Sequence, residues 1–201
     1  MQSKTLIINN YQFTIFPQVY EPADDTFLIA DNLNTPQGAT LLDLGTGCGI
    51  LAILAAEKAT HVVATDINPY AVICAERNVK HNHLAHKIEV RQGNLFHPLH
   101  QNETFDQILF NPPYIPDIQS PSRWLDKAWN GGLSGRIWIN PFLKQVSQYL
   151  RKGGILLLIQ SSLSGYEETL TKLKRDNYFV CILVKQKLFF ETLVLIQAIK
   201  Q

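Results

Sequence analysis

The residues best suited to chemistry form a glycine-rich turn, followed about 20 residues later by a carboxylate. The strand expected over Thr40 to Leu44 runs into Asp43-Leu44-Gly45-Thr46-Gly47-Cys48-Gly49, and a helical stretch begins at Ile50. Glycines in such a turn let main-chain N–H groups come against a ligand. Asp66 ends the next expected strand, where a carboxylate can accept hydrogen bonds from both hydroxyls of a ribose. Together these features predict a site for a nucleotide-like ligand.

The spacing within the turn narrows the choice of ligand. It reads Gly-x-Gly-x-Gly, not the Gly-x-Gly-x-x-Gly of dinucleotide-binding folds, and Asp43 stands just before the first glycine. A carboxylate there would repel a pyrophosphate and suits the ammonium of a sulfonium cofactor, so we predict S-adenosyl-L-methionine. Two simpler interpretations stay open. The glycines could serve only tight packing of helix on strand, and Asp66 could only cap the helix after Asn68.

A second group, Asn111-Pro112-Pro113-Tyr114, directly follows the strand expected over Asp106 to Phe110. An amide or exocyclic amino nitrogen is a poor nucleophile, and its N–H groups must be held on acceptors while a methyl group approaches. The Asn111 side-chain oxygen and the Pro112 carbonyl offer two acceptors, and Tyr114 offers a flat apolar face. We therefore assign nitrogen methylation to Asn111, Pro112, Pro113 and Tyr114. An ordinary proline turn after a strand is the alternative.

The elements that must position these residues alternate between apolar runs and stretches of helical period. Thr40 to Leu44, His61 to Asp66, Asp106 to Phe110 and Ile155 to Ile159 are expected strands, and the last has no polar alternation. Strands covered on both faces have this pattern, so we predict an α/β fold with a mostly parallel, Rossmann-like sheet and helices on both faces. Asn68 should cap a helix that starts at Pro69.

The last third of the chain has a different pattern. Tyr166, Leu170 and Leu173 mark a helix, and Tyr178 to Val184 and Phe190 to Ile199 follow as strands. The short connection from Lys185 to Phe189 predicts an antiparallel C-terminal strand pair. By contrast, the segment from Asn111 to Arg136 is rich in proline and glycine and is expected to be a structureless loop. Loops of that length in compact domains are usually functional.

The composition indicates one compact domain. The chain has 201 residues, of which 46% are apolar and 17% charged, with a formal charge of +1. We expect a single domain over 1–201 and, because no broad basic surface is implied, no binding of nucleic acid by bulk charge. Three widely spaced cysteines form no CxxC pair, and no apolar run is long enough for a membrane span. A cytoplasmic protein with reduced thiols is therefore expected, with no membrane association.

These motifs resemble the class I methyltransferases, and more closely the HemK family of release-factor glutamine methyltransferases. The short archaeal and eukaryotic type is the nearest match. The similarity runs from about Val19 to Ile199. It includes Val19-Tyr20-Glu21-Pro22-Ala23-Asp24-Asp25-Thr26-Phe27-Leu28, Ala128-Trp129-Asn130-Gly131-Gly132 and Phe189-Phe190-Glu191-Thr192-Leu193. The extra helical N-terminal domain of the bacterial members has no counterpart here.

The resemblance implies methylation of the glutamine side-chain amide in the Gly-Gly-Gln loop of a translation termination factor. It also implies residues 1–35 as an extension packed over the cofactor site, and a small zinc-binding activator subunit as a possible partner. Asn111 to Tyr114 would hold the glutamine. Carried over by position, the cofactor contacts would be Thr26, Asp43, Gly45, Gly47, Gly49, Asp66, Ile67, Asn94, Leu95 and Asn111.

The chain departs from the family pattern at several places. Asn94 stands where an acidic residue usually accepts from the adenine amino group, and a neutral bond contributes ~1 kcal/mol where a charged one contributes ~2. Pro141 falls inside an expected helix, which either starts with Asn140 as its cap or is kinked. Gln119 to Asp126 matches nothing in the family, so the role of loop 115–135 stays open.

Other residues carry weaker signals. His81, His83 and His86 are close in sequence, but they lie at an expected helix end, so we predict no metal site. Trp124, Trp129 and Trp138 could contact substrate or pack the loop onto the domain, and Cys48 is expected to be a small filler. Two further functions compete with the glutamine methyltransferase. One is a nucleobase (adenine) amino methyltransferase acting on RNA or DNA, and the other is a non-catalytic binding subunit.

Overall fold

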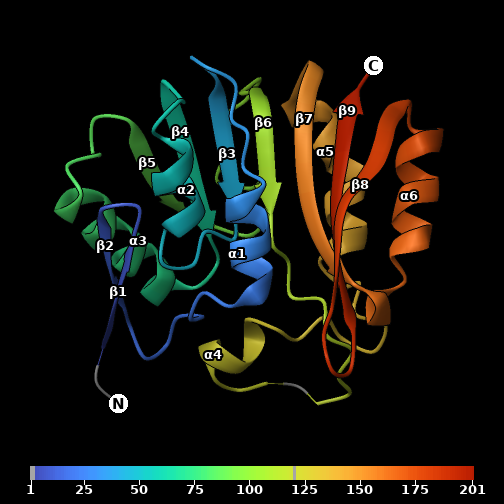
Figure 1. Ribbon diagram of the computed structural model, residues 1–201, viewed down its shortest axis with the longest axis horizontal. Helices are drawn as coiled ribbons and strands as arrows, with labels where there is room; N and C mark the ends of the chain where they lie inside the picture. Colours follow the sequence, from blue (N-terminus) through green and yellow to red (C-terminus); the bar gives the residue numbers. More distant parts are fainter. Residues whose placement is uncertain (1–2, 120) are drawn as a thin grey trace.

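The computed structural model describes residues 3–119 and 121–201 of the chain. Its centre is a seven-stranded sheet with the strand order β5-β4-β3-β6-β7-β9-β8 (Figure 1). A separate two-stranded sheet lies at the N-terminal end. The strands are β1 (Lys4–Ile8), β2 (Tyr11–Ile15), β3 (Thr40–Leu44), β4 (His61–Asp66), β5 (Ile88–Gln92), β6 (Phe105–Phe110), β7 (Leu150–Ser161), β8 (Tyr178–Lys187) and β9 (Thr192–Lys200).

Helices cover both faces of the central sheet. α1, α2 and α3 lie on the face turned toward the viewer in Figure 1, whereas α5 and α6 pack behind β7, β9 and β8. The helices are α1 (Asp24–Asp31), α2 (Ile50–Ala55), α3 (Pro69–His81), α4 (Trp124–Lys127), α5 (Ile139–Tyr149) and α6 (Tyr166–Arg175), with a short 3-10 turn at Ser162–Ser164. The α/β fold class predicted from the sequence is confirmed.

Continuous apolar runs make the centre of the sheet. β3 pairs in parallel with both β4 and β6, and Leu42 aligns with Val63 on one side and with Ile108 on the other. These three side chains are fully buried, as expected for strands covered on both faces. β9 runs antiparallel to β7 and to β8, which confirms the predicted C-terminal pair. The bounds of the two strands differ from the predicted ones. β8 continues to Lys187, and the connection runs from Leu188 to Glu191 instead of from Lys185 to Phe189.

The helix after β4 begins as the sequence predicts. The Asn68 side chain accepts a hydrogen bond from the Tyr70 N–H (3.0 Å), and Pro69 is the first helical residue. Proline is tolerated there because its missing N–H would have no partner in the first turn.

One of the two expectations for Pro141, that Asn140 caps the helix, was wrong. α5 begins at Ile139 with Trp138 at the cap position, so Asn140 is not the cap. Helical hydrogen bonding already includes the Asn140 N–H donating to the Arg136 carbonyl (3.0 Å). Pro141 therefore lies in the first turn of the helix, where a proline needs no hydrogen bond and no kink.

The described residues of the segment 111–136, all except Ser120, are not structureless, which corrects the sequence-based expectation. It contains α4 and an isolated bridge between Ile115 and Asn130. The Ile115 N–H donates to the Trp129 carbonyl (3.0 Å) and the Gly131 N–H donates to the Ile115 carbonyl (2.8 Å). Glycine and proline content indicated a loop, but main-chain pairing between residues distant in sequence gives it a fixed shape.

The β1–β2 hairpin was not predicted, although Asn9 and Asn10 are a recognisable turn signal. Both have positive φ (49° and 69°), which asparagine tolerates better than most residues. The hairpin packs on α3. Asn78 acts as a substitute strand partner, since its Oδ1 accepts from the Thr14 N–H (2.8 Å) and its Nδ2 donates to the Thr14 carbonyl (2.9 Å).

Within the part of the chain that the structure describes, none of the helices combines the length and apolar character required to cross a lipid bilayer.

Candidate active site

A cavity of about 570 Å³ opens at the carboxyl ends of β3, β4 and β6. Parallel α/β sheets place ligands at this edge, and the volume lies within the range of small-molecule sites. The glycine turn lines it through Gly45, Thr46, Gly47 and Cys48, and Asn111, Pro112, Pro113 and Tyr114 line it as well. The two motifs found in the sequence therefore face one space.

The glycine turn has a backbone that needs glycine. Gly45, Gly47 and Gly49 have φ values of 74°, 59° and 85°, all in the left-handed region. A Cβ built on Gly47 would meet no atom within 4 Å, and one on Gly45 would lie 3.9 Å from the Asn111 carbonyl oxygen. The turn thus presents bare backbone to the cavity and lies next to Asn111. The N–H groups of Gly45 and Thr46 donate to the Thr65 carbonyl (2.8 and 2.9 Å), which ties the turn to β4.

Asp43 lies behind this turn, and it is not among the residues that line the cavity. Its Oδ2 accepts from Thr46 Oγ1 (2.6 Å) and from the Ala52 N–H (3.1 Å), so it joins the turn to the first turn of α2. Burial raises the pKa of Asp43 to about 6, against the lowering effect of those two hydrogen bonds. Gly49 also lies off the cavity, where its left-handed φ starts α2 and a Cβ would come within 3.2 Å of Ala75.

Asp66 faces the cavity from the end of β4. Its Oδ2 accepts from the Gly47 N–H (2.9 Å) and its Oδ1 accepts from the Asn68 N–H (2.8 Å). Burial raises the pKa of Asp66, although these hydrogen bonds and one from Ile67 act in the opposite direction. Each carboxylate oxygen keeps further acceptor capacity, which suits a pair of hydroxyl donors.

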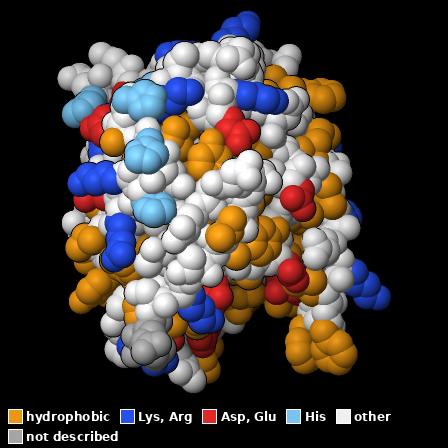
Figure 2. Space-filling model, turned by 60° about the vertical axis from the view of Figure 1, so that its left-hand side comes forward, with side chains coloured by type: hydrophobic (Ala, Val, Ile, Leu, Met, Phe, Trp, Pro, Cys, Tyr) orange, Lys and Arg blue, Asp and Glu red, His pale blue; other side chains and the backbone are white. Residues whose placement is uncertain are grey.

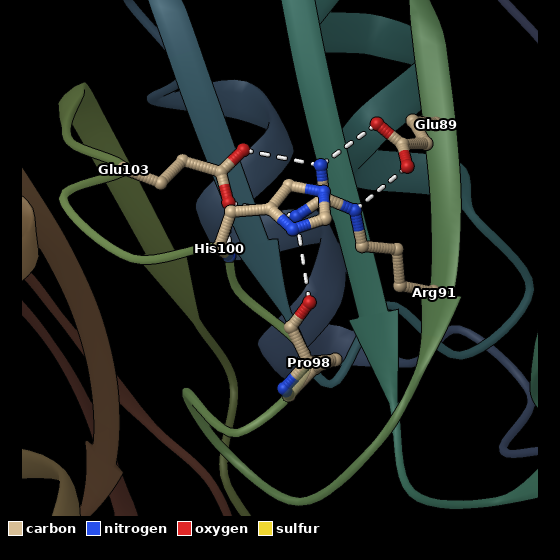
Figure 3. A network of polar contacts seen from close by, with 5 residues as sticks. All are labelled: Glu89, Arg91, Pro98, His100 and Glu103. Carbon is tan, nitrogen blue, oxygen red and sulfur yellow. Dashed lines mark hydrogen bonds and ion pairs between the residues drawn. The ribbon is translucent and has the colours of Figure 1, made fainter.

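Asn94 and Leu95 reach the cavity from the loop that follows β5, a strand not predicted from the sequence. Figure 3 shows how Arg91 of β5 lies between two carboxylates next to that loop. Arg91 pairs with Glu89 (2.8 Å) and with Glu103 (2.7 Å), and the Glu103 carboxylate also accepts from the His100 N–H (2.9 Å). The Arg91 side chain is only 11% exposed.

The other end of this loop is anchored by packing. Phe96 stacks on Tyr149 with ring centroids 4.4 Å apart and lies 5.6 Å from the ring of Phe142. Leu95 takes a left-handed backbone conformation (φ 46°), which is uncommon for this residue type and is kept by the anchors on either side. The loop therefore presents Asn94 and Leu95 in a fixed position.

Tyr114 is held by a buried carboxylate that sequence reasoning did not assign. Its hydroxyl donates to Asp25 Oδ2 (3.0 Å), and the Tyr20 hydroxyl donates to Oδ1 of the same carboxylate (3.1 Å). The Thr26 N–H also donates to Asp25 (2.6 Å). Burial first, and then the charge of Asp25, raise the pKa of both tyrosines well above the ordinary value, so both phenols stay protonated donors. Asp25 and Tyr20 belong to the N-terminal motif, but their contact with Tyr114 arises only when the chain folds, so the sequence does not reveal it.

The backbone of Tyr114 is also closely packed. A Cβ on Gly135 would lie 2.4 Å from the Tyr114 carbonyl oxygen, so only glycine fits there. Trp124, Trp129 and Trp138 all line the cavity, and Trp129 packs edge-on against Tyr20 at 6.5 Å. Both roles considered for these tryptophans, loop packing and substrate contact, remain compatible with their position.

Of the residues singled out from the sequence, most line the one cavity. These are Thr26, Gly45, Gly47, Asp66, Ile67, Asn94, Leu95, Asn111, Pro112, Pro113 and Tyr114. Asp43 and Gly49 shape the turn from behind it. Asp25, Tyr20 and Glu191 line the cavity too and were not assigned as site residues. The Cys48 thiol is buried, which raises its pKa to about 12 and suits a filler better than a nucleophile.

Histidines gather near lysine and arginine side chains on the face shown in Figure 2. His81 ends α3, and His83, with φ 59°, lies in the turn after it. Among the described residues, no three His, Cys, Asp or Glu side chains come together in a way that could hold a metal ion.

Comparison with known proteins gives a consistent result. Residues 21–128 match the family model described as the methyltransferase small domain. The chain is 39% identical to a putative protein N5-glutamine methyltransferase of Methanocaldococcus jannaschii, over 95% of this chain and 96% of that protein. It is 32% identical to the methyltransferase HEMK2 of Homo sapiens, over 79% of each.

Solved structures agree with these relatives. The chain matches the E. cuniculi Mtq2–Trm112 complex, described as responsible for methylation of the eRF1 translation termination factor. The TM-score is 0.72 at 26% identity, with 92% of this chain and 99% of that chain covered.

Proposed function

Since the chain belongs to the HemK-type protein-glutamine N5-methyltransferases, within the methyltransferase small domain family, we propose that its substrate is a translation termination factor. The enzyme transfers a methyl group from S-adenosyl-L-methionine to the side-chain amide nitrogen of a glutamine, and we assign this to the Gly-Gly-Gln loop of that factor. The observation that carries the proposal is that the glycine turn and Asn111 to Tyr114 line one cavity.

The residues of the cavity fit this cofactor. Asp66 has acceptor capacity for ribose hydroxyls, and the bare backbone of Gly45 and Gly47 leaves room for a ligand in contact with the turn. Asn94 and Leu95 line the same cavity, and we assign them to the adenine base. We propose that Thr26, Gly45, Gly47, Asp66, Ile67, Asn94, Leu95 and Asn111 contact the cofactor, while Asp43 and Gly49 hold the turn in shape. When bound, S-adenosyl-L-methionine supplies a methyl group on a cationic sulfur that needs no prior activation.

Asn111 and Pro112 would orient the substrate amide. The Asn111 side-chain oxygen and the Pro112 carbonyl accept the two N–H groups of the substrate amide, which turns the nitrogen lone pair toward the cofactor side of the cavity. The same acceptors stabilise the positive charge that develops on nitrogen, and the extra proton leaves to water afterwards. Pro113 stiffens the corner, and Tyr114, fixed by Asp25, presents its ring to the planar amide.

The N-terminal residues complete the enclosure. Val19, Tyr20, Pro22, Asp25 and Thr26 line the cavity, and we propose that residues 1–35 serve as an extension over the cofactor site within one domain of residues 1–201. Water exclusion by such a cover strengthens polar contacts inside. A termination factor as substrate also implies that the enzyme works in the cytoplasm.

The test is methyl transfer to a defined glutamine. The protein is incubated with S-adenosyl-L-methionine and a termination factor of the same organism, and tryptic peptides are examined by mass spectrometry. We expect one added methyl group on the Gly-Gly-Gln glutamine. The nucleobase alternative would instead give labelled nucleic acid and unlabelled factor.

An activator subunit is a further part of the proposal. The similar Mtq2 protein was solved in complex with Trm112. In this chain Ile67, just before α3, and Tyr70 and Ile73 within it are 41%, 43% and 55% exposed, and Ile67 also lines the cavity. We propose that a small zinc-binding activator covers these side chains. Co-expression with a Trm112-type protein should give a stable complex that Ile73→Asp disrupts, and an unaffected complex would place the activator elsewhere.

A further inference from the structure

Glu191 lies in the turn between β8 and β9, and its side chain forms part of the cavity wall. The turn is closed by the Leu188 N–H, which donates to the Glu191 carbonyl (2.8 Å). The next N–H, that of Thr192, donates to Ser162 Oγ (3.0 Å). The main chain therefore holds Glu191 in a defined place in this turn, and the β8–β9 turn lies at the same end of the molecule as α4 (Figure 1).

One oxygen of the Glu191 carboxylate is an unsatisfied hydrogen-bond acceptor. Among the described residues, Glu191 Oε2 has no hydrogen-bond partner, although it is shielded from solvent. Buried polar atoms nearly always have a partner, because an unmet one costs free energy on folding. In the same cavity the carboxylate of Asp25 accepts from Tyr20, Tyr114 and Thr26. In the described part of the chain, buried side-chain atoms without a partner also occur on Thr35, Gln107, Gln160 and Tyr178, but those residues do not line the cavity. The position of Glu191 in the cavity wall indicates that its Oε2 is kept for a donor that arrives with a ligand.

The position of Glu191 indicates that it contacts the substrate and not the cofactor. The residues assigned to the cofactor come mainly from the ends of β3, β4 and β5, whereas Glu191 precedes β9, on the other side of β6 in the strand order. Glu191 is near Tyr114: after burial and Asp25, its charge is among the causes that raise the pKa of that tyrosine. Just outside the cavity, Phe189 and Phe190 are 91% and 85% exposed, in edge-on contact at 4.6 Å.

We propose that Glu191 is a specificity-determining residue that accepts a hydrogen bond from a main-chain N–H of the substrate polypeptide next to the methylated glutamine. This inference rests on the proposed function. The two N–H groups of the glutamine amide are already taken by Asn111 and Pro112. Glycine neighbours have no side chain, so the donor that remains is the main chain itself. The Phe189–Phe190 pair forms an apolar rim past which the polypeptide enters.

The first test separates binding of substrate from binding of cofactor. With a Gly-Gly-Gln peptide, Glu191→Ala should raise the peptide KM by about 10- to 100-fold, as for a lost hydrogen bond to a charged group. The values of kcat and of the S-adenosyl-L-methionine Kd should stay within about threefold, and Tm should not fall, because an unmet buried carboxylate is removed. Glu191→Gln keeps an acceptor oxygen and should retain most of the affinity. Glu167→Ala, at an exposed position of α6 away from the cavity, is the matched control.

The second test removes the donor instead of the acceptor. Two peptides are made, one with an N-methylated main chain at the glutamine and one at the glycine before it. One of them should bind the wild-type protein about 10- to 100-fold more weakly, yet bind E191A no more weakly than the unmodified peptide does.

Several results would overturn the inference. An unchanged peptide KM in E191A, a raised cofactor Kd, a loss in E191Q equal to that in E191A, or full binding of both N-methylated peptides would each do so. Failure of the proposed function looks different. In that case the wild-type protein, with a Trm112-type activator present, transfers no methyl group to the unmodified peptide.

Discussion

At the scale of single residues, Asp43 shows how a motif position can have a different task from the one its chemistry suggests. A carboxylate before the first glycine suits an ammonium ligand, and the sequence alone allows that role. In the structure its Oδ2 is occupied by Thr46 and Ala52, inside the protein behind the turn. Asp43 therefore stabilises the conformation of the glycine turn and does not itself line the cavity.

Asp43→Asn should separate these two roles. The amide can keep an oxygen toward Thr46 and Ala52, so we expect the cofactor Kd to change by no more than about fivefold, because a neutral bond differs from a charged one by only ~1 kcal/mol. If Asp43 holds the cofactor ammonium directly, the loss would be about 10-fold or more. Isothermal titration with S-adenosyl-L-methionine distinguishes the two results.

The same variant has a pH signature. The pKa of Asp43 is raised by burial to about 6, above its value in an unfolded chain, so the native state holds the proton more tightly. Stability contributed by protonated Asp43 is present at pH 4 and is lost as pH rises toward 6, at up to about 1.4 kcal/mol per pH unit. Relative to wild type, D43N should therefore gain stability between pH 4 and 6 and show no further change above. Urea unfolding at several pH values measures this difference.

At the scale of elements, Asn78 couples the N-terminal hairpin to the glycine turn. Its Nδ2 donates both to the Thr14 carbonyl (2.9 Å) and to the Cys48 carbonyl (2.8 Å). Asn82, the residue that caps the C-terminal end of α3, makes the equivalent contacts to Gln12 on the exposed part of the hairpin, and its Nδ2 also donates to the Asn78 carbonyl (2.8 Å). Both asparagines thus hold the same hairpin, and Asn78 also contacts the glycine turn.

Asn78→Ala should lower stability by roughly 1–3 kcal/mol for each buried group left without a partner and raise the cofactor Kd. Asn82→Ala should lower stability by less and leave the Kd unchanged, because it has no contact with the turn. Chemical denaturation and cofactor titration of both variants check the comparison. Equal Kd values for N78A and wild type would show that the turn keeps its shape without Asn78.

The loop after β5 depends on Arg91 in the same way. Arg91→Ala leaves Glu103 without its cation, and Glu103 also receives the His100 N–H of that loop. We expect the cofactor Kd to rise about tenfold, equivalent to ~1.4 kcal/mol, with little change in kcat at saturating cofactor. Lys172→Ala removes a partly exposed ion pair with Asp176 on α6 and serves as the control. A Kd in R91A equal to that in K172A would contradict the positioning role.

At the scale of the whole molecule, the parts that could be predicted are those encoded locally. β3 and β4 were predicted to the residue because each has consecutive apolar residues at its centre, Leu41-Leu42 in β3 and Val62 to Ala64 in β4, next to polar residues. The β1–β2 hairpin and β5 were missed because their alternation is short, although Asn9-Asn10 could have signalled the hairpin. The glycine turn and the Asn-Pro-Pro-Tyr group were recognisable because their chemistry lies within a few consecutive residues.

What could not be predicted depends on contacts between distant segments. Asp25 of α1 meets Tyr114, which lies 89 residues further along the chain, and Glu191 reaches the same cavity from the C-terminal hairpin. The paired shape of 111–136 arises from hydrogen bonds between Ile115 and residues near Asn130, which proline and glycine content does not reveal. A motif therefore identifies the chemistry, while the fold decides which residues support it.

The most direct test concerns Asn111, whose side-chain oxygen is assigned as an acceptor for the amide that is methylated. Methyl transfer to the termination factor and the cofactor Kd are measured side by side for wild type and Asn111→Ala. We expect transfer to fall by about 10²–10³-fold or more, as for other preorganised polar groups at reacting centres, while the Kd changes by less than about threefold. Equal losses of transfer and of cofactor affinity would show that Asn111 does not act as this acceptor.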